Sequence, residues 1–153
     1  MDKIIEMNSL NFSNNRDIRK KILEITDKMD QQQLAIWASD CVEHVLSNFE
    51  EKYPHDERPR KAIEAARAWV NDTISVDEAR SAALKAHAAA RESEDDVACV
   101  VARAAGHAAA TAHVAKHAIH AANYAAKVDF KELTWQYKKI LEFKTNNKEK
   151  ILH

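Results

Sequence analysis

Histidine is the residue type in this sequence with the clearest capacity for chemistry, because imidazole binds transition metals and titrates near neutral pH. Three of the eight histidines, His113, His117 and His120, are separated by four and then three residues. This spacing predicts that they share one face of a helix. Two histidines four residues apart on a helix can bind one metal ion. His120 would lie about 10 Å along the helix axis from His113, too far for all three to bind the same ion.

A complete metal site would need further ligands, and His87, His107 and Cys99 are the available candidates. Neither an HExxH nor an ExxH pattern occurs, which argues against a zinc-protease site and a di-iron carboxylate site. We therefore interpret the imidazoles as hydrogen-bonded to carboxylates or carbonyls between closely packed helices, and we predict no metal and no cofactor. The alternative is a metal-binding helical protein, or a metal-dependent hydrolase, that uses His87, His107, His113 and His117.

The arginines are the second notable set. Three lie on one predicted helix, Arg80 and Arg91 share one side of the next helix with Leu84 and His87, and Arg103 lies among apolar residues. A lone buried charge is costly, so these arginines should have carboxylate partners. Glu64, Glu78 and Asp95 are the candidates. We interpret the set as an internal network that fixes the helix register, with a polar pocket or a partner-binding surface as the alternative.

Composition excludes several classes of function. No serine or cysteine nucleophile has an evident base beside it, and one glycine cannot build a glycine-rich phosphate loop. No catalytic residue is therefore predicted. The net charge of −1 provides no overall field that would attract nucleic acid or an acidic membrane.

The elements that must position these side chains are helices. The chain has one glycine and two prolines and no alternating strand pattern, so we predict an all-α protein. The segment from Val97 to Lys127 is mostly alanine and histidine. Alanine is the best helix former, and its small side chain lets helices pack near the short end of the usual ~8–10 Å separation. We expect a compact bundle of about six to seven helices with this segment at its centre, and a neighbouring group against the bare backbone of Gly106.

Helices are predicted over residues 16–28, 31–52, 58–73, 76–92 and 130–146, with Ser75 as an N-cap whose capping-box partner is Glu78. A further helical segment follows the predicted cap Ser93 and reaches Lys127. Unbroken, it would be about 50 Å long, so we expect a break near Ala110–Thr111, with Thr111 as a cap. Residues 1–15 are predicted to be a lead-in, 16–146 a single helical domain and 147–153 a frayed tail.

Cys41 and Cys99 form no CxxC pair and lie among apolar residues, so we expect buried free thiols. Residues 1–7 are short and mixed in charge, unlike a signal peptide. No uninterrupted apolar stretch approaches the ~20 residues that span a bilayer. These features predict a cytoplasmic protein.

Three ordered blocks carry a family resemblance. They are DERPRKAIEAARAWV (Asp56–Val70), EARSAALKAHAAARE (Glu78–Glu92) and ARAAGHAAATAHVAKHAIHAANYAAK (Ala102–Lys127). Together they resemble a family of bacterial immunity proteins assigned to polymorphic toxin systems. The resemblance implies a small all-helical protein that binds and neutralises a cognate toxin without catalysis.

The family motif, carried over position by position, marks residues that either bind the partner or form a structural polar network: Arg58, Pro59, Arg60, Glu64, Arg67, His87, Arg91, Arg103, His107, His113 and His117. A charged partner face would have to be local in so nearly neutral a chain, and the acids Asp72, Asp77, Glu78 and 92–96 are candidates. We expect no nucleic-acid or membrane partner. Homodimerisation through alanine faces is a further possibility.

Overall fold

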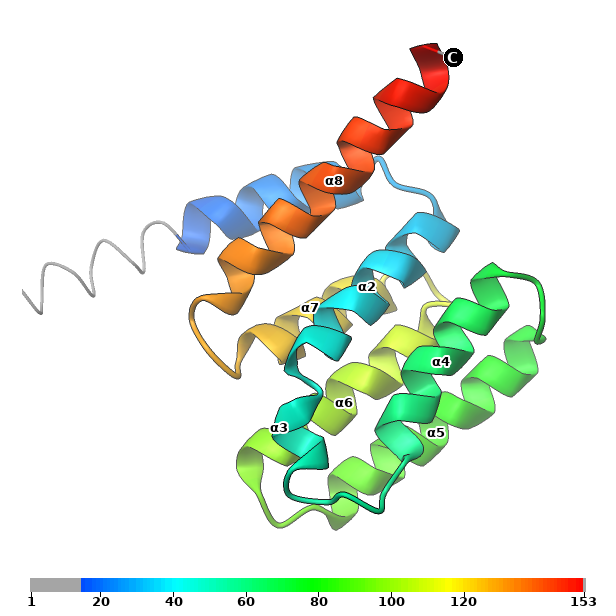
Figure 1. Ribbon diagram of the computed structural model, residues 1–153, viewed down its shortest axis with the longest axis vertical. Coiled ribbons are helices and arrows are strands. Elements are labelled where there is room, and N and C mark those ends of the chain that lie inside the picture. The colour runs from blue at the N-terminus through cyan, green and yellow to red at the C-terminus, as the bar shows by residue number, and fades with distance from the viewer. Residues whose placement is uncertain (1–14, 153) are drawn as a thin grey trace, which may run out of the picture. The chain divides into compact units, whose positions relative to one another are not determined.

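The computed structural model describes residues 15–152, and the side chains of residues 15–143 (Figure 1). Helical residues 15–26 are followed by seven helices, and none of the described residues lies in a strand. The helices are α2 (Gln31–Val45), α3 (Ser47–Glu50), α4 (Arg58–Val70), α5 (Val76–Glu92), α6 (Asp96–Ala110), α7 (His117–Ala126) and α8 (Glu132–Leu152). The prediction of an all-α bundle is confirmed.

The chain divides into two compact units. Residues 30–129 form the larger one, and the described residues 15–29 and 130–152 form the smaller one. The predicted lead-in lies almost entirely outside the described residues. The predictions of one domain over 16–146 and of a frayed tail stay predictions, although α8 is helical to Leu152.

In the larger unit, α6 is the central helix. It packs against α5 and α7 on its two sides and also against α2, α3 and α4. The helices α5, α6 and α7 thus form one layer, and α2 and α4 pack against it (Figure 1). Alanines and Gly106 make up most of the buried side of α6, so neighbouring helices can approach it from several directions. This arrangement confirms the alanine-rich centre expected from the sequence.

Large and small core residues come from different parts of this unit. The large side chains of the core are at most 2% exposed and come from α2, α3, α4 and the turn between α2 and α3: Trp37, Leu46, Phe49 and Ile63. The buried residues of α5 and α7 are all alanine. The first half of the unit therefore supplies the volume of the core, and the second half supplies a thin surface on which that volume packs.

The start of α5 confirms the predicted cap: Ser75 and Glu78 form a capping box. Other predicted boundaries were wrong: the last helix, predicted over 130–146, runs from Glu132 to Leu152, and three more differ as follows. The helix predicted over 31–52 is interrupted after Val45, where the Leu46 amide bonds to the Glu43 carbonyl in a tighter turn. Helix α4 ends at Val70 because Asp72 adopts a left-handed φ of 58°, a conformation that stops a helix. The N-cap of α6 is Asp95 and not Ser93.

The predicted break near Ala110–Thr111 is confirmed, but the role of Thr111 differs. Thr111 is the C-cap of α6, and its Oγ1 donates a hydrogen bond to the His107 carbonyl at 3.1 Å. The next helix begins at His117. His113 therefore lies in the connecting turn, and the prediction that it continues the helix of His117 and His120 was wrong.

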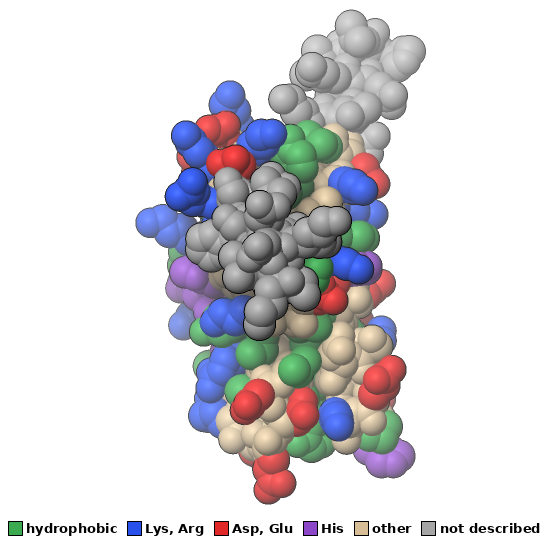
Figure 2. Space-filling model, turned by 90° about the vertical axis from the view of Figure 1, so that its left-hand side faces the viewer, with side chains coloured by type: hydrophobic (Ala, Val, Ile, Leu, Met, Phe, Trp, Pro, Cys, Tyr) green, Lys and Arg blue, Asp and Glu red, His purple; other side chains and the backbone are tan. Residues whose placement is uncertain are grey.

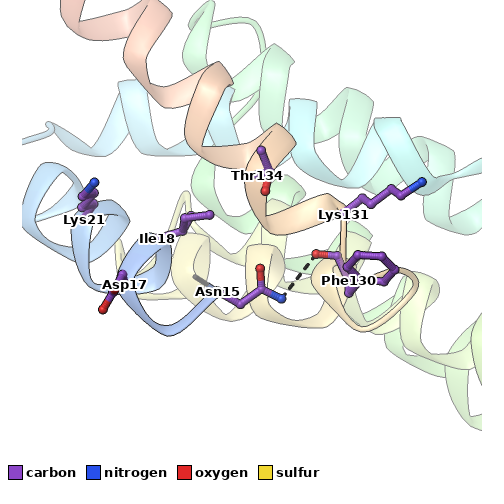
Figure 3. Close-up of a pocket in the computed structure, with 7 residues that line it drawn as sticks. All are labelled: Asn15, Asp17, Ile18, Lys21, Phe130, Lys131 and Thr134. Atoms are coloured by element: carbon purple, nitrogen blue, oxygen red, sulfur yellow. Dashed lines mark hydrogen bonds between the residues drawn. The ribbon is translucent and has the colours of Figure 1, made fainter. Parts of the chain in front are cut away.

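The smaller unit contains helical residues 15–26 and α8. Asn15 donates from Nδ2 to the carbonyl of Phe130 at 3.5 Å, beside a cavity of about 290 Å³ (Figure 3). Asp17, Ile18, Lys21, Lys131 and Thr134 complete the lining of this cavity. Its mixed lining of one acid, two lysines and two apolar side chains selects no ligand class.

Cys41 is buried and Cys99 half-buried, and both are free thiols. The prediction of free thiols is thus confirmed, and full burial holds for Cys41 alone. None of the described helices combines the length and the apolar character needed to cross a membrane.

Candidate functional site

The arginines of α4 form ion pairs that connect neighbouring segments. Arg58 donates to Asp56 from Nε at 2.9 Å and from Nη2 at 2.7 Å, and it also contacts Glu92 at the end of α5. Arg60 makes a similar two-point contact with Glu50 of α3, at 2.7 and 2.6 Å. Such two-point contacts match the planar guanidinium to the carboxylate and fix their relative orientation.

Arg67, on the same helix, contacts both Asp40 and Glu43 of α2, with 3.0 Å to the Asp40 oxygen. It thereby links α4 to α2. The pKa values of Glu50 and Asp56 lie below their usual range, chiefly because each carboxylate accepts hydrogen bonds from its arginine. The α4 arginines are thus held in ion pairs between segments of the fold.

The carboxylate partners predicted for the arginines were wrong. Glu78 closes the capping box of α5, and Asp95 caps α6. Glu64 is exposed and forms no ion pair with a described residue. The actual partners lie on α2, on α3, in the segment before α4 and at the end of α5, and sequence spacing alone does not bring them together.

Four histidines meet on the other side of α6. We call His87 of α5, His107 of α6, and His117 and His120 of α7 the imidazole cluster. His107 lies in the middle: its ring centroid is 5.0 Å from that of His87, 5.1 Å from His117 and 5.4 Å from His120. Its Nδ1 is 2.9 Å from Nδ1 of His117, so one of these nitrogens donates and the other accepts. The ring of Tyr124 stacks on His107 at 5.3 Å.

Gly106 explains how His87 reaches this position. A Cβ atom at residue 106 would lie 2.6–2.8 Å from three atoms of the His87 ring, closer than non-bonded carbon atoms can approach. The imidazole of α5 therefore rests on the bare backbone of α6. This contact confirms the expectation that a neighbouring group lies against the only glycine of the chain.

Burial and neighbouring positive charge both disfavour protonation in the cluster. Desolvation, followed by the charges of the other histidines and Arg103, lowers the pKa of His107 to about 4. The pKa of His87 is lowered by burial and then by Arg103 and Arg91. Burial, His120 and His113 lower that of His117. His107 is therefore neutral at pH 7.

The cluster histidines are positioned by contacts with one another, and not by the hydrogen bonds to carboxylates or carbonyls that we predicted from the sequence. Within the described part of the chain, no group of three or more histidine, cysteine, aspartate or glutamate side chains is arranged to hold a metal ion. His113 is exposed in the turn before α7 and does not join the cluster. The four-histidine metal set considered from sequence is thus divided, with His87, His107 and His117 together and His113 outside.

Arg91 and Arg103 lie close enough to His87 to lower its pKa. Unlike the α4 arginines, neither forms an ion pair with any carboxylate that the structure describes. Eight of the eleven residues marked from sequence therefore form two sets, one of ion pairs around α4 and one of imidazoles and unpaired arginines on α5–α7. Pro59, Glu64 and His113 belong to neither set. His120 was placed on the face of His117 from sequence but was left out of the predicted site. Tyr124 was missed, although its position seven residues after His117 places it on the same face.

A groove of about 300 Å³ lies beside Arg58 and is lined also by Lys61, Glu78, Ser81, Ala82 and Lys85. Arg58 is held by Asp56 and Glu92, and Lys61 lies 3.5 Å from Glu57. Two of the three cations in the lining are thus paired with carboxylates, and Lys85 is not paired with a described residue, which makes the groove a weaker candidate site than the imidazole side.

Comparisons with curated proteins and with solved structures found no match. A family model described as "Imm-5 like putative immunity protein" matches residues 24–145, which include α2–α7, both polar sets and much of α8. An immunity protein implies, in general terms, a toxin as its partner. Because the match covers most of the sequence, the chain belongs to this Imm-5-like family of immunity proteins.

Proposed function

We propose that this protein binds a cognate bacterial toxin of a polymorphic toxin system in the cytoplasm and neutralises it by occlusion, without catalysing a reaction. The family match over residues 24–145 carries this proposal. The match includes both polar sets, and we propose that the partner-binding residues lie among them.

The chemistry of the two sets supports binding. The α4 arginines are engaged in ion pairs that hold α2–α5 together. The cluster histidines contact each other and Tyr124, and no serine or cysteine nucleophile lies beside them in the contacts described. Side chains so arranged can fix helices and present a surface, which is what occlusion of another protein requires.

The test is co-expression with the toxin encoded beside this gene. We expect growth to recover when the two chains are produced together, and the purified pair to elute as one complex in size-exclusion chromatography. Failure to protect cells that contain the folded chain would refute the proposal.

Titration separates binding from catalysis. In an in vitro assay of toxin activity, an occluding protein must be present in at least equimolar amount for full inhibition. Inhibition by a small fraction of an equivalent would indicate that the chain modifies the toxin catalytically.

A further inference from the structure

Arg91 and Arg103 lie beside the imidazole cluster, and neither forms an ion pair with a carboxylate that the structure describes. We call the imidazole cluster together with Arg91 and Arg103 the cationic face. We propose that the cationic face receives the toxin, and that the toxin surface bound there is rich in carboxylates. This inference rests on the function proposed above and identifies the surface that performs it.

The sequence around Arg103 has a positive formal charge. No aspartate or glutamate occurs between Val97 and Val128. The same segment contains Arg103, Lys116 and Lys127, so its formal charge is +3 when its four histidines are counted as neutral. The net charge of the chain is −1, so the remaining residues carry −4. A nearly neutral protein thus has a locally cationic region, and complementary potentials speed the encounter of partners.

The arginines of the two sets differ in what they contact. Arg58, Arg60 and Arg67 are each held by one or two carboxylates of this chain. Arg91 and Arg103 have no such pair among the described residues, although Arg103 is half-buried. A half-buried guanidinium without an ion pair in its own chain can gain charge-assisted hydrogen bonds from carboxylates of another molecule.

The residues around the cationic face suit a protein interface. Leu84, three residues before His87 on α5, is 69% exposed, the most exposed of the large apolar side chains described. Tyr124 stacks on His107, and Nζ of Lys127 lies 4.6 Å from its ring centroid. Tyrosine and arginine dominate the binding energy of many interfaces. In the space-filling view, histidine side chains reach the surface at the left edge (Figure 2).

The acidic residues considered from sequence as a partner face are less available. Glu92 contacts Arg58, Glu78 belongs to the capping box of α5, and Asp95 caps α6. These carboxylates already have local roles, whereas the arginines of the cationic face do not. Asp72, Asp77, Glu94 and Asp96 are exposed acids that also form no ion pair with a described residue. The charges beside the imidazole cluster, however, are the guanidinium groups of Arg91 and Arg103. A partner that binds at the cluster therefore meets positive charge, which favours an acidic protein surface.

The experiment reverses the charge of both arginines in the full chain, with Arg91→Glu and Arg103→Glu together. The matched control reverses two exposed lysines elsewhere, with Lys28→Glu and Lys52→Glu, and gives the same change in net charge. Thermal unfolding verifies that both variants fold. Affinity for the neighbouring-gene toxin is measured at low and at high salt, and growth protection is measured in parallel.

We expect the arginine reversals to weaken toxin binding by at least about 30-fold, because loss of a desolvated charge contact costs that much or more, and to abolish protection. The lysine control should keep both. If the wild-type chain protects cells and the arginine variant binds the toxin and protects equally well, this inference is overturned. The proposed function would then remain intact.

If the wild-type chain does not protect, the proposed function fails, and retention on immobilised poly-L-glutamate still tests the surface. A carboxylate-binding face would be supported if the wild-type chain and the lysine control are retained and the arginine variant is not. Equal behaviour of the two variants would overturn it. Tight binding of a duplex DNA oligonucleotide that depends on both arginines would also overturn it, because the partner would then be a phosphate polymer.

Discussion

Replacing Gly106 with alanine tests the contact on which the imidazole cluster depends. Inside a helix, alanine is favoured over glycine by about 1 kcal/mol. The new Cβ would lie 2.6–2.8 Å from three atoms of the His87 ring, so the ring or α5 must move. Overpacking of this kind costs about 1–3 kcal/mol. We therefore expect Gly106→Ala to lower the free energy of unfolding by about 1 kcal/mol, despite its better helix propensity.

The control removes the ring. In a His87→Ala background the added Cβ meets no imidazole, so the same Gly106→Ala change should raise the free energy of unfolding by about 0.5–1 kcal/mol. The two residues should thus be coupled by about 1.5–2 kcal/mol in a double-mutant cycle. Urea denaturation of the four proteins measures this coupling. Equal effects of Gly106→Ala in both backgrounds would show that His87 does not rest on residue 106.

Three further predictions follow from the same contacts. The pKa of His107, about 4 when folded against 6.5 when unfolded, means that the unfolded chain binds more protons between these values. The contribution of His107 to stability should therefore fall by about 1–2 kcal/mol as pH drops from 6.5 to 4, because solvent screens the half-buried ring. Urea denaturation should show a shallower pH dependence for His107→Gln, and parallel profiles would contradict the shift. Arg67→Met should lower stability by about 0.5–1 kcal/mol, because its pairs with Asp40 and Glu43 are partly exposed, whereas Lys61→Met should change the melting temperature little. Elemental analysis of the purified protein should find no stoichiometric zinc, iron or manganese, and one equivalent of any of them would revive the metal-binding alternative.

Local features of the fold were predictable because they depend on neighbours in sequence. Ser75 and Glu78 are three residues apart, the spacing that a capping box requires, and they form one. The alanine content of 97–127 indicated a central, closely packed helix, and α6 occupies that position. The only glycine marked a close approach, although the identity of the approaching residue, His87, depends on how α5 packs against α6.

The arrangement of the site was less predictable because its contacts join distant segments. Arg67 meets Asp40 and Glu43, more than twenty residues away on α2, and no local periodicity pairs these positions. The helical spacing of His113 and His117 was misleading in another way. The chain leaves the helical path between Thr111 and Lys116, so two residues with ideal spacing do not share a helix. Sequence thus identified most of the chemically notable residues, and tertiary packing determined which of them meet.

The distribution of charge also explains why the net charge of −1 was a poor guide to the binding surface. Arginines that hold helices together need carboxylates from the same chain, and α4 has them on α2, on α3, before its own start and at the end of α5. Each such pair cancels in the total and contributes little to the external field. The charges that remain are those without a partner, and Arg91 and Arg103 are among them. A partner encounters the unpaired charges, so the surface it recognises is set by how the chain pairs its charges and not by their sum.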